Sequence, residues 1–220
     1  MTAARLSLTY GESLQWRLMR ILIATLALFA LGSCSTAPPE AKKPPGVAAI
    51  PEPVTALKAF YRVYSAARMW SPDVMPLRVE SMPVEGITPK DGKFGAWRVT
   101  FSSLAKGKIK VFTYAVVEAS ATLHEGVFSV GEDRWSGPTL IEQPFYVQAF
   151  KIDSDAALKI AQEKSAEYVK KNPKRPVFMR LEFTRLYPEA AWRVLWGESL
   201  AMSDHSIYVS AGSGRYLGKS

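Results

Sequence analysis

The chain has 220 residues, of which 48% are hydrophobic, so it can bury one sizeable core or two small ones. Its formal net charge of +8 permits attraction to anionic lipid headgroups, cell-wall polymers or acidic proteins, without choosing among them. The basic residues are spread along the sequence and form only short clusters such as Lys170-Lys171, which argues against a nucleic-acid partner.

An apolar run near the amino terminus predicts export. Two arginines, Arg17 and Arg20, precede an apolar run over residues 21–31, in which Thr25 is the one polar residue. This run is too short to span a bilayer and is typical of the central part of a signal peptide. We therefore expect residues 1–33 to form a signal peptide, with translation starting at Met1 or at Met19.

The run ends in Leu31-Gly32-Ser33-Cys34, which resembles the lipobox of bacterial lipoproteins. The resemblance implies cleavage before Cys34, a diacylglyceryl group on its sulfur and acylation of the new amino terminus. Two or three acyl chains make a membrane attachment stable, whereas one chain is marginal. The expected partner is therefore a bacterial membrane, bound through a lipid anchor at Cys34, with the protein facing the periplasm or the extracellular side.

Residues 34–53 are predicted to form a linker. They hold six prolines and little that could enter a core, so an extended spacer with a reach of at most about 60 Å is expected. Ser35 follows the cysteine, which in enterobacteria-like sorting favours the outer membrane over the inner one. Loss of residues 1–33 would remove three arginines and one glutamate, which lowers the net charge to +6.

The rest of the chain repeats itself. Ala-Leu-Lys occurs at residue 56 and again at residue 157, and Ala-Trp-Arg-Val occurs at 96–99 and at 191–194. Both landmarks recur about 100 residues apart, as a duplicated unit would leave them. We predict a first unit over residues 54–150 and a second over 151–220, with Trp97 and Trp192 at equivalent inward positions.

Each unit is predicted to begin with a helix and to continue as strands. The first helix runs from Ala56 to Ser71-Pro72, and the second runs from an N-cap at Asp153 to Asn172-Pro173. Behind each helix the apolar period changes to two, which indicates strands with one buried face. The predicted strands are 77–84, 94–101 and 108–118 in the first unit, and 177–184, 192–196 and 206–211 in the second, with a turn at 212–214 before Tyr216. The fold class is α+β, with two tandem helix-plus-antiparallel-sheet units.

The order of these elements resembles the PepSY domain. The resemblance rests on the helix, the strands, the Ala-Trp-Arg-Val segment and the closing sequence Ile-Tyr-Val-Ser-Ala-Gly-Ser-Gly-Arg-Tyr-Leu. Residues 153–218 match best, although Ser210 stands where the family usually has Asp, and residues 54–130 lack the closing sequence. The resemblance implies a non-catalytic module, of a kind found in protease-inhibiting propeptides, cell-wall accessory proteins and membrane-anchored exported proteins.

The sequence offers little for catalysis. Its only histidines, His124 and His205, lie beside loop-like sequence and are expected on the solvated surface, and its one thiol would be blocked by lipid. Neither a Cys-His nucleophile nor a zinc site can be assembled from these residues. Gly212-Ser213-Gly214 ends a strand and opens no helix, so it is a turn and not a nucleophile elbow. We expect no enzyme activity, no cofactor and no metal.

Charged residues recur on the predicted outer face of both units, where two arginines surround one carboxylate at what the pattern predicts to be matching strand positions. The six residues are Arg78, Glu80 and Arg98 in the first unit and Arg180, Glu182 and Arg193 in the second. They form either a cross-strand salt ladder or a recognition face for an acidic partner.

The predicted function is a binding module in the cell envelope, with a protein, a peptide or an anionic polymer as its partner. It would act as a protease-regulatory or envelope-assembly accessory. The alternative is a small-molecule carrier or hydrolase with a site between sheet and helix, walled by the aromatic residues. The sequence leaves the oligomeric state open.

Overall fold

The computed structural model describes residues 51–183 and 185–220. The predicted signal peptide, the predicted lipidation site Cys34 and most of the predicted linker lie outside these residues. The first half of the described chain contains α2 (Ala56–Trp70), β1 (Met75–Met82), β2 (Ala96–Ser103), β3 (Lys108–Ala115) and β4 (Gly126–Arg134). The second half contains η1 (Val147–Ala149), α3 (Ser154–Lys164), α4 (Ala166–Lys171), β5 (Val177–Phe183), β6 (Ala190–Gly197), β7 (Ser203–Ser210) and β8 (Tyr216–Lys219).

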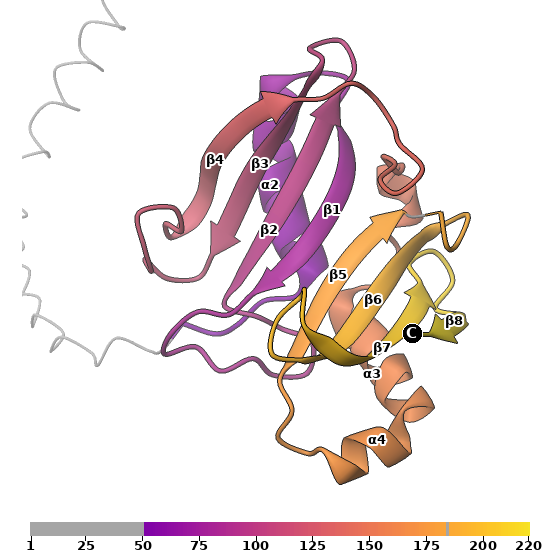
Figure 1. Cartoon of the computed structure of the whole chain (residues 1–220). Helices are drawn as coiled ribbons and strands as arrows, with labels where there is room; N and C mark the ends of the chain where they lie inside the picture. The colour runs from indigo at the N-terminus through magenta and orange to yellow at the C-terminus, as the bar shows by residue number, and fades with distance from the viewer. Residues whose placement is uncertain (1–50, 184) are drawn as a thin grey trace, which may run out of the picture. The chain divides into compact units, whose positions relative to one another are not determined.

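All eight strands belong to one antiparallel sheet with the order β4-β3-β2-β1-β5-β6-β7-β8. The helices α2 and α3 lie on the same face of this sheet, and the opposite face is turned toward the viewer in Figure 1. The α+β class is therefore confirmed. The two predicted units are not separate bodies, because β1 of the first half pairs directly with β5 of the second.

The first helix has the predicted bounds. Its apolar residues recur every three or four positions, and Phe60, Val63 and Ala67 are fully buried against the sheet. The helix stops at Ser71 because the following residue is Pro72, which disfavours helical backbone in the residue before it.

The second helix is predicted as one element, and this is wrong: it is broken into α3 and α4 at Ser165. The Ser165 hydroxyl lies 2.6 Å from Nε2 of His205, on β7. The imidazole also stacks on the Tyr168 ring at 4.4 Å between centroids. His205 is half-buried beneath α4, so the prediction of a solvated surface position for it is wrong as well.

The amino termini of α2 and α3 meet, and the second half caps both. Asp153 precedes α3 and accepts a bond from the amide of Ser154, and the same Oδ1 atom accepts one from the amide of Leu57 in α2. The Ser154 hydroxyl accepts the amide of Ala56 at 3.0 Å. The N-cap of α2, Thr55, makes no side-chain capping bond of its own.

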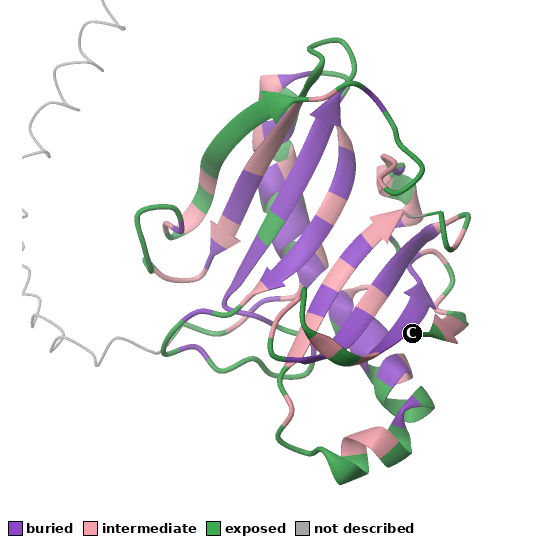
Figure 2. Cartoon of the chain, in the orientation of Figure 1, coloured by how far each residue is buried: buried purple, intermediate pink, exposed green. Residues whose placement is uncertain are grey.

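One apolar core lies between the helices and the sheet and runs through both halves (Figure 2). Trp97 and Trp192 are both fully buried, and their rings meet edge to face at 6.3 Å. The prediction of equivalent inward positions for these two side chains is confirmed. Each indole also donates to the carbonyl two residues before its helix, Trp97 to Val54 and Trp192 to Ile152.

The predicted strands are present with ends shifted by a few residues, but the sequence pattern did not indicate β4. This strand lies at the sheet edge and is exposed along most of its length (Figure 2). A β-bulge opposite Val111-Phe112 and three charged residues, Glu132 to Arg134, blunt this edge against pairing with another chain.

Candidate functional site

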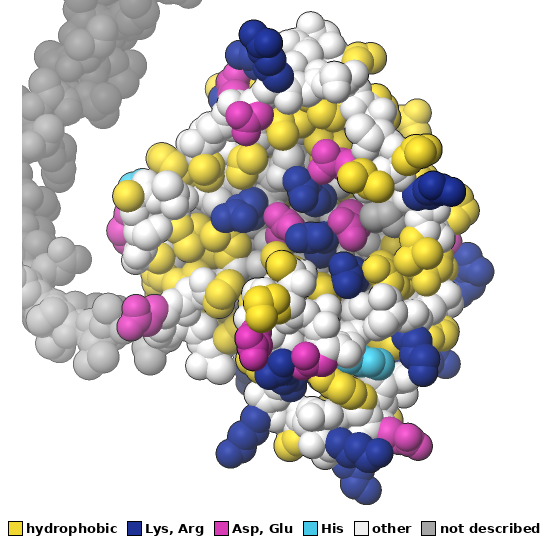
Figure 3. Space-filling model, in the orientation of Figure 1, with side chains coloured by type: hydrophobic (Ala, Val, Ile, Leu, Met, Phe, Trp, Pro, Cys, Tyr) yellow, Lys and Arg dark blue, Asp and Glu magenta, His cyan; other side chains and the backbone are white. Residues whose placement is uncertain are grey.

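The six predicted partner-binding residues lie on the sheet face that carries no helix, on the four central strands. The strand register places Arg98, Glu80, Arg180 and Arg193 in one row that crosses β2, β1, β5 and β6. Arg78 and Glu182 oppose each other in the next row. Charged side chains gather in the middle of this face with apolar side chains around them (Figure 3).

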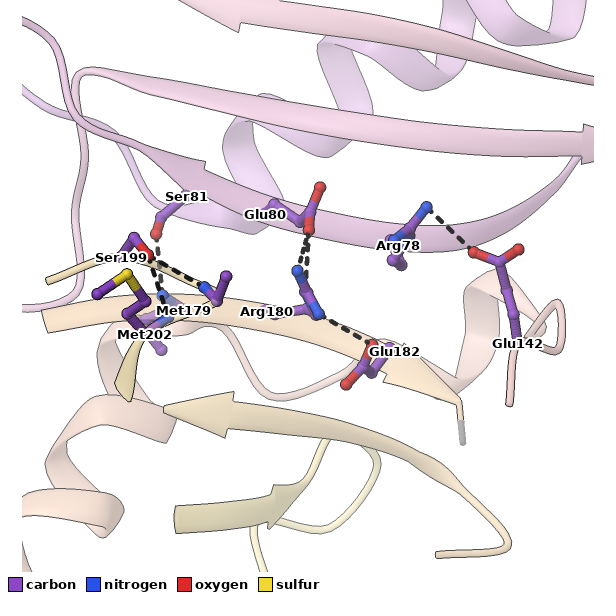
Figure 4. A network of polar contacts seen from close by, with 10 residues as sticks. Arg78, Glu80, Ser81, Glu142, Met179, Arg180, Glu182, Ser199 and Met202 are labelled. Atoms are coloured by element: carbon purple, nitrogen blue, oxygen red, sulfur yellow. Dashed lines mark hydrogen bonds and ion pairs between the residues drawn. The ribbon is translucent and has the colours of Figure 1, made fainter. Parts of the chain in front are cut away.

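Glu80 and Arg180 form the centre of the cluster. Both Nε and an Nη atom of Arg180 lie within 2.9 Å of one Glu80 oxygen, across the β1–β5 junction (Figure 4). Glu80 is only 6% exposed, so this pair is largely removed from water. Because the β1–β5 register covers only three residue pairs in the described chain, this ion pair is a main fastening between the two halves. The Ser81 hydroxyl adds another by accepting the Met179 amide at 2.9 Å.

Arg78 is held by a residue that the sequence analysis did not single out. Its guanidinium lies 3.1 Å from the carboxylate of Glu142, in the segment between β4 and η1 (Figure 4). No periodic pattern surrounds Glu142, so only the folded chain shows this contact. The pair ties the connection between the two halves to the edge of the charged cluster.

Glu182 is the least well compensated member of the cluster. Its nearest cation is Arg180 at 3.8 Å, beyond hydrogen-bond distance. Burial raises the pKa of this carboxyl, although Arg180, Arg193 and Arg78 act in the opposite direction. The arginines therefore lower the cost of the buried charge without removing it.

Arg98 and Arg193 differ from the other arginines of the cluster. Within residues 51–183 and 185–220, neither forms an ion pair. Arg98 is exposed on β2, and Arg193 lies over the Tyr208 ring at 5.7 Å with one long bond of 3.4 Å to Ser206. The guanidinium groups of Arg98 and Arg193 thus lie on either side of the Glu80–Arg180 ion pair, whose charges cancel each other.

Exposed apolar side chains surround one end of the charged cluster. Ile141, beside the Arg78 partner Glu142, is 80% exposed, and Leu140 and Leu186 are also exposed. The backbone of Gln143 bonds to Phe183 at the end of β5, which brings the 139–146 segment against this part of the sheet. A partner on this face would meet charged groups in the centre and apolar groups at the margin.

The sequence predicts that Arg78 and Glu80 correspond to Arg180 and Glu182. The strand pairing shows a correspondence that is shifted by two residues. Trp97 pairs with Ser81 on β1, and Trp192 pairs with Leu181 on β5. Because the two tryptophans are equivalent, Ser81 corresponds to Leu181, and Glu80 therefore corresponds to Arg180. Arg78 then corresponds to Phe178. The match of Arg98 with Arg193 holds, and the pseudo-two-fold axis passes between the paired side chains of Glu80 and Arg180.

The described residues hold no cluster of three or more His, Cys, Asp or Glu side chains suited to a metal ion. His124 pairs with Glu118 at 2.6 Å beside the Phe128 ring, and His205 is engaged beneath α4. The Gly212-Ser213-Gly214 segment forms the predicted turn between β7 and β8, with Gly214 at a φ of +74°.

No family model matches the chain, and no curated protein matches it either. Among solved structures, a "putative lipoprotein" from Clostridium difficile 630 is similar over 74% of this chain and 91% of that one, with a TM-score of 0.43 and 7% identity. A likeness this distant does not establish a function. The PepSY resemblance stays a prediction. None of the helices in the described part of the chain is long and apolar enough to cross a membrane.

Proposed function

We propose that this protein is an exported lipoprotein, anchored to a bacterial membrane at Cys34, that acts as a non-catalytic binding module in the cell envelope. The observation that carries the binding proposal is the pair Arg98 and Arg193. Within the described residues both guanidinium groups lack an ion pair, and they lie on a sheet face without helices, at equivalent places in the two halves.

The geometry favours a partner with two anionic groups. Two strands separate β2 from β6, so the Cα atoms of Arg98 and Arg193 lie about 14 Å apart at ordinary strand spacing. A guanidinium presents forked donors that match carboxylate or phosphate. An acidic protein segment or peptide, or an anionic polymer, fits this spacing with apolar contacts near Ile141.

A matched pair of double variants tests the face. Arg98→Gln/Arg193→Gln removes both guanidinium groups, whereas Arg62→Gln/Lys159→Gln removes the same charge from exposed positions on α2 and α3. Binding to immobilised polyglutamate and to solubilised envelope proteins should weaken at least tenfold for the first variant only. An equal loss of binding in both double variants would show that net charge alone attracts the partner. Undiminished binding by Arg98→Gln/Arg193→Gln would reject this sheet face as the binding site.

The anchor has its own test. Replacing Cys34 by Ala removes the only thiol, so the chain should remain an uncleaved precursor or become soluble. Cell fractionation measures this directly. A processed Cys34→Ala protein that stays with the membrane would contradict the lipoprotein proposal while leaving the binding face unaffected.

The alternative, a small-molecule carrier or hydrolase with a site between sheet and helices, has less support. Phe60, Phe150 and Trp192 pack against one another in that space, with centroid distances of 5.4 Å and 5.6 Å. A surface cleft of about 580 Å³ does exist between the β1–β2 connection and α3. Its lining combines prolines and other apolar side chains with charged ones such as Lys90, Asp91 and Arg175, and it includes no histidine or cysteine.

A further inference from the structure

A second surface of interest lies at the carboxyl end of α2, on the side of the domain away from the entry of the chain. There the β2–β3 turn packs against the end of the helix, and the Ser71 and Ser103 hydroxyls lie 3.0 Å apart. We call this surface the tip and define it by Met69, Trp70, Leu104, Lys106, Lys108 and Trp135. It is remote from the charged cluster on the central strands.

The tip exposes apolar side chains in a fixed arrangement. Met69 is 90% exposed and Leu104 is 73% exposed, more than most large apolar residues of the domain. Lys106 lies over the Trp70 ring at 6.0 Å from its centroid. The backbone of Trp135 lies beside the turn, because its amide donates to the Gly107 carbonyl at 2.9 Å, and its side chain is half-buried.

A hydrogen-bonded cage around Asp73 holds the turn in this form. One carboxylate oxygen accepts the hydroxyls of Ser71 and Ser103 at 2.6 Å each, and the other accepts the amide of Ala105 at 2.9 Å. The Ala105 amide, with these hydroxyls, holds the pKa of Asp73 well below its ordinary value. These bonds hold the turn in the form in which Leu104 is exposed.

Basic side chains outnumber acidic ones around these apolar groups, with Asp73 and Glu132 among the nearby carboxylates. Arg68 and Lys106 are exposed without an acidic partner in the described chain, and Lys108 and Lys110 share a single carboxylate, Glu132. Tryptophan prefers the boundary between water and lipid, and each basic residue near an anionic leaflet adds attraction. Exposed aliphatic, indole and basic groups together match an anionic membrane surface better than they match a soluble acidic peptide.

We propose that the tip docks on the anionic headgroups of a lipid bilayer. This inference rests on the proposed anchor, which places the domain beside a membrane. The tip lies one helix length, about 22 Å, from the point where the chain enters the domain. The linker reaches up to about 60 Å, so it is long enough for the tip to touch the membrane that holds Cys34.

A fluorescent label next to Leu104 tests the docking. Ala105→Cys introduces a thiol at the tip, and Ala156→Cys introduces one at an exposed position on α3 as the control. The full lipidated proteins are labelled with an environment-sensitive dye and reconstituted into neutral phosphatidylcholine vesicles or into vesicles with phosphatidylglycerol. The expected result is a blue-shifted emission, quenched by brominated lipid, for the tip label on anionic vesicles only.

Charge variants refine the test. Lys106→Gln/Lys108→Gln should lower the ratio of docked to undocked tips about thirtyfold, whereas Lys170→Gln/Lys171→Gln on α4 should leave it unchanged. Water-like emission of the tip label on both vesicle types would overturn the proposal. A shift with soluble dextran sulfate but not with vesicles would also overturn it and would assign the tip to a polymer.

Labelling of the parent protein tests the lipid anchor at Cys34 separately from the docking of the tip. The parent protein has only Cys34, which takes no dye when it is lipidated. Dye on the parent protein would show a free Cys34 and would reject the anchor. The vesicle dependence of the Ala105→Cys label, measured after subtraction of the parent signal, would still decide the docking of the tip.

Discussion

The two halves of the sheet agree in their core and differ at their junction. Each half buries a tryptophan whose indole bonds to the chain just before its helix, and each presents an arginine one residue later, Arg98 or Arg193. At the pseudo-two-fold axis, however, the equivalent positions hold Glu80 and Arg180, and these two side chains pair with each other.

This difference shows what joining two similar units in one chain allows. In a symmetric dimer of identical units, a residue on the two-fold axis faces its own copy, and a charged residue there meets a like charge. Within a single chain the two positions vary independently. Opposite charges then stabilise the junction, while the equivalent arginines beside it, Arg98 and Arg193, form no ion pair in the described chain.

The largest expected effect tests the agreement between the halves. Trp97→Ala and Trp192→Ala should each lower the free energy of unfolding by about 3 to 5 kcal/mol, because each side chain is fully buried and leaves a cavity. Urea denaturation followed by circular dichroism measures both, with the Trp→Phe variants as milder controls. A large loss for only one of the two would argue against equivalent positions.

The second-largest effect on stability is expected at the β1–β5 junction, where Glu80 pairs with Arg180. Arg180→Gln leaves Glu80 buried without a full cation and should cost about 3 kcal/mol. The double variant Glu80→Gln/Arg180→Gln removes both charges and should recover most of this loss. If the single variant melts like the parent protein, the ion pair does not fasten the halves.

A smaller effect is expected at the helix starts, where the halves are unequal. Asp153 caps both helices, so Asp153→Ala should cost about 2 kcal/mol, roughly 1 kcal/mol for each cap. Thr55→Ala should change stability by less than about 0.5 kcal/mol, because the Thr55 side chain makes no capping bond. Equal losses would show that each helix is capped by its own half.

The smallest effect on stability concerns the break between α3 and α4, which the first half lacks. Burial lowers the pKa of His205 from its ordinary value of 6.5, and Lys219 adds to this. The fold therefore favours the neutral imidazole, so this part of the stability is present above pH 6.5 and is lost as the pH falls through the lower folded value. Melting temperatures of the parent protein and His205→Gln should converge between pH 7.5 and pH 5. A constant difference would mean that the imidazole does not titrate in this range.

Elements with a clear period were predictable, and elements that depend on distant contacts were not. The first helix follows from apolar spacing and Pro72, and Trp97 and Trp192 were placed by strand alternation. At the break, Ser165 contacts His205, which is 40 residues away, so no local pattern marks this contact. The edge strand β4 is exposed on both faces and therefore lacks alternation.

The candidate site was partly predictable for the same reason. Strand alternation identified the face and its six charged residues, but not the register that pairs Glu80 with Arg180 or the contact of Arg78 with Glu142. Register depends on how β1 meets β5, a contact between distant segments. The separation of Arg98 and Arg193 from the paired arginines could only come from that register.

Photo-crosslinking in living cells tests the central claim most directly, since it reports which face touches a partner in the envelope. A photoreactive amino acid replaces exposed Ile141, beside the charged cluster, or exposed Tyr61 on α2. We expect a discrete adduct from position 141 that disappears in the Arg98→Gln/Arg193→Gln background, and none from position 61. An adduct from position 61 alone, or one from position 141 that persists without the two arginines, would contradict the claim.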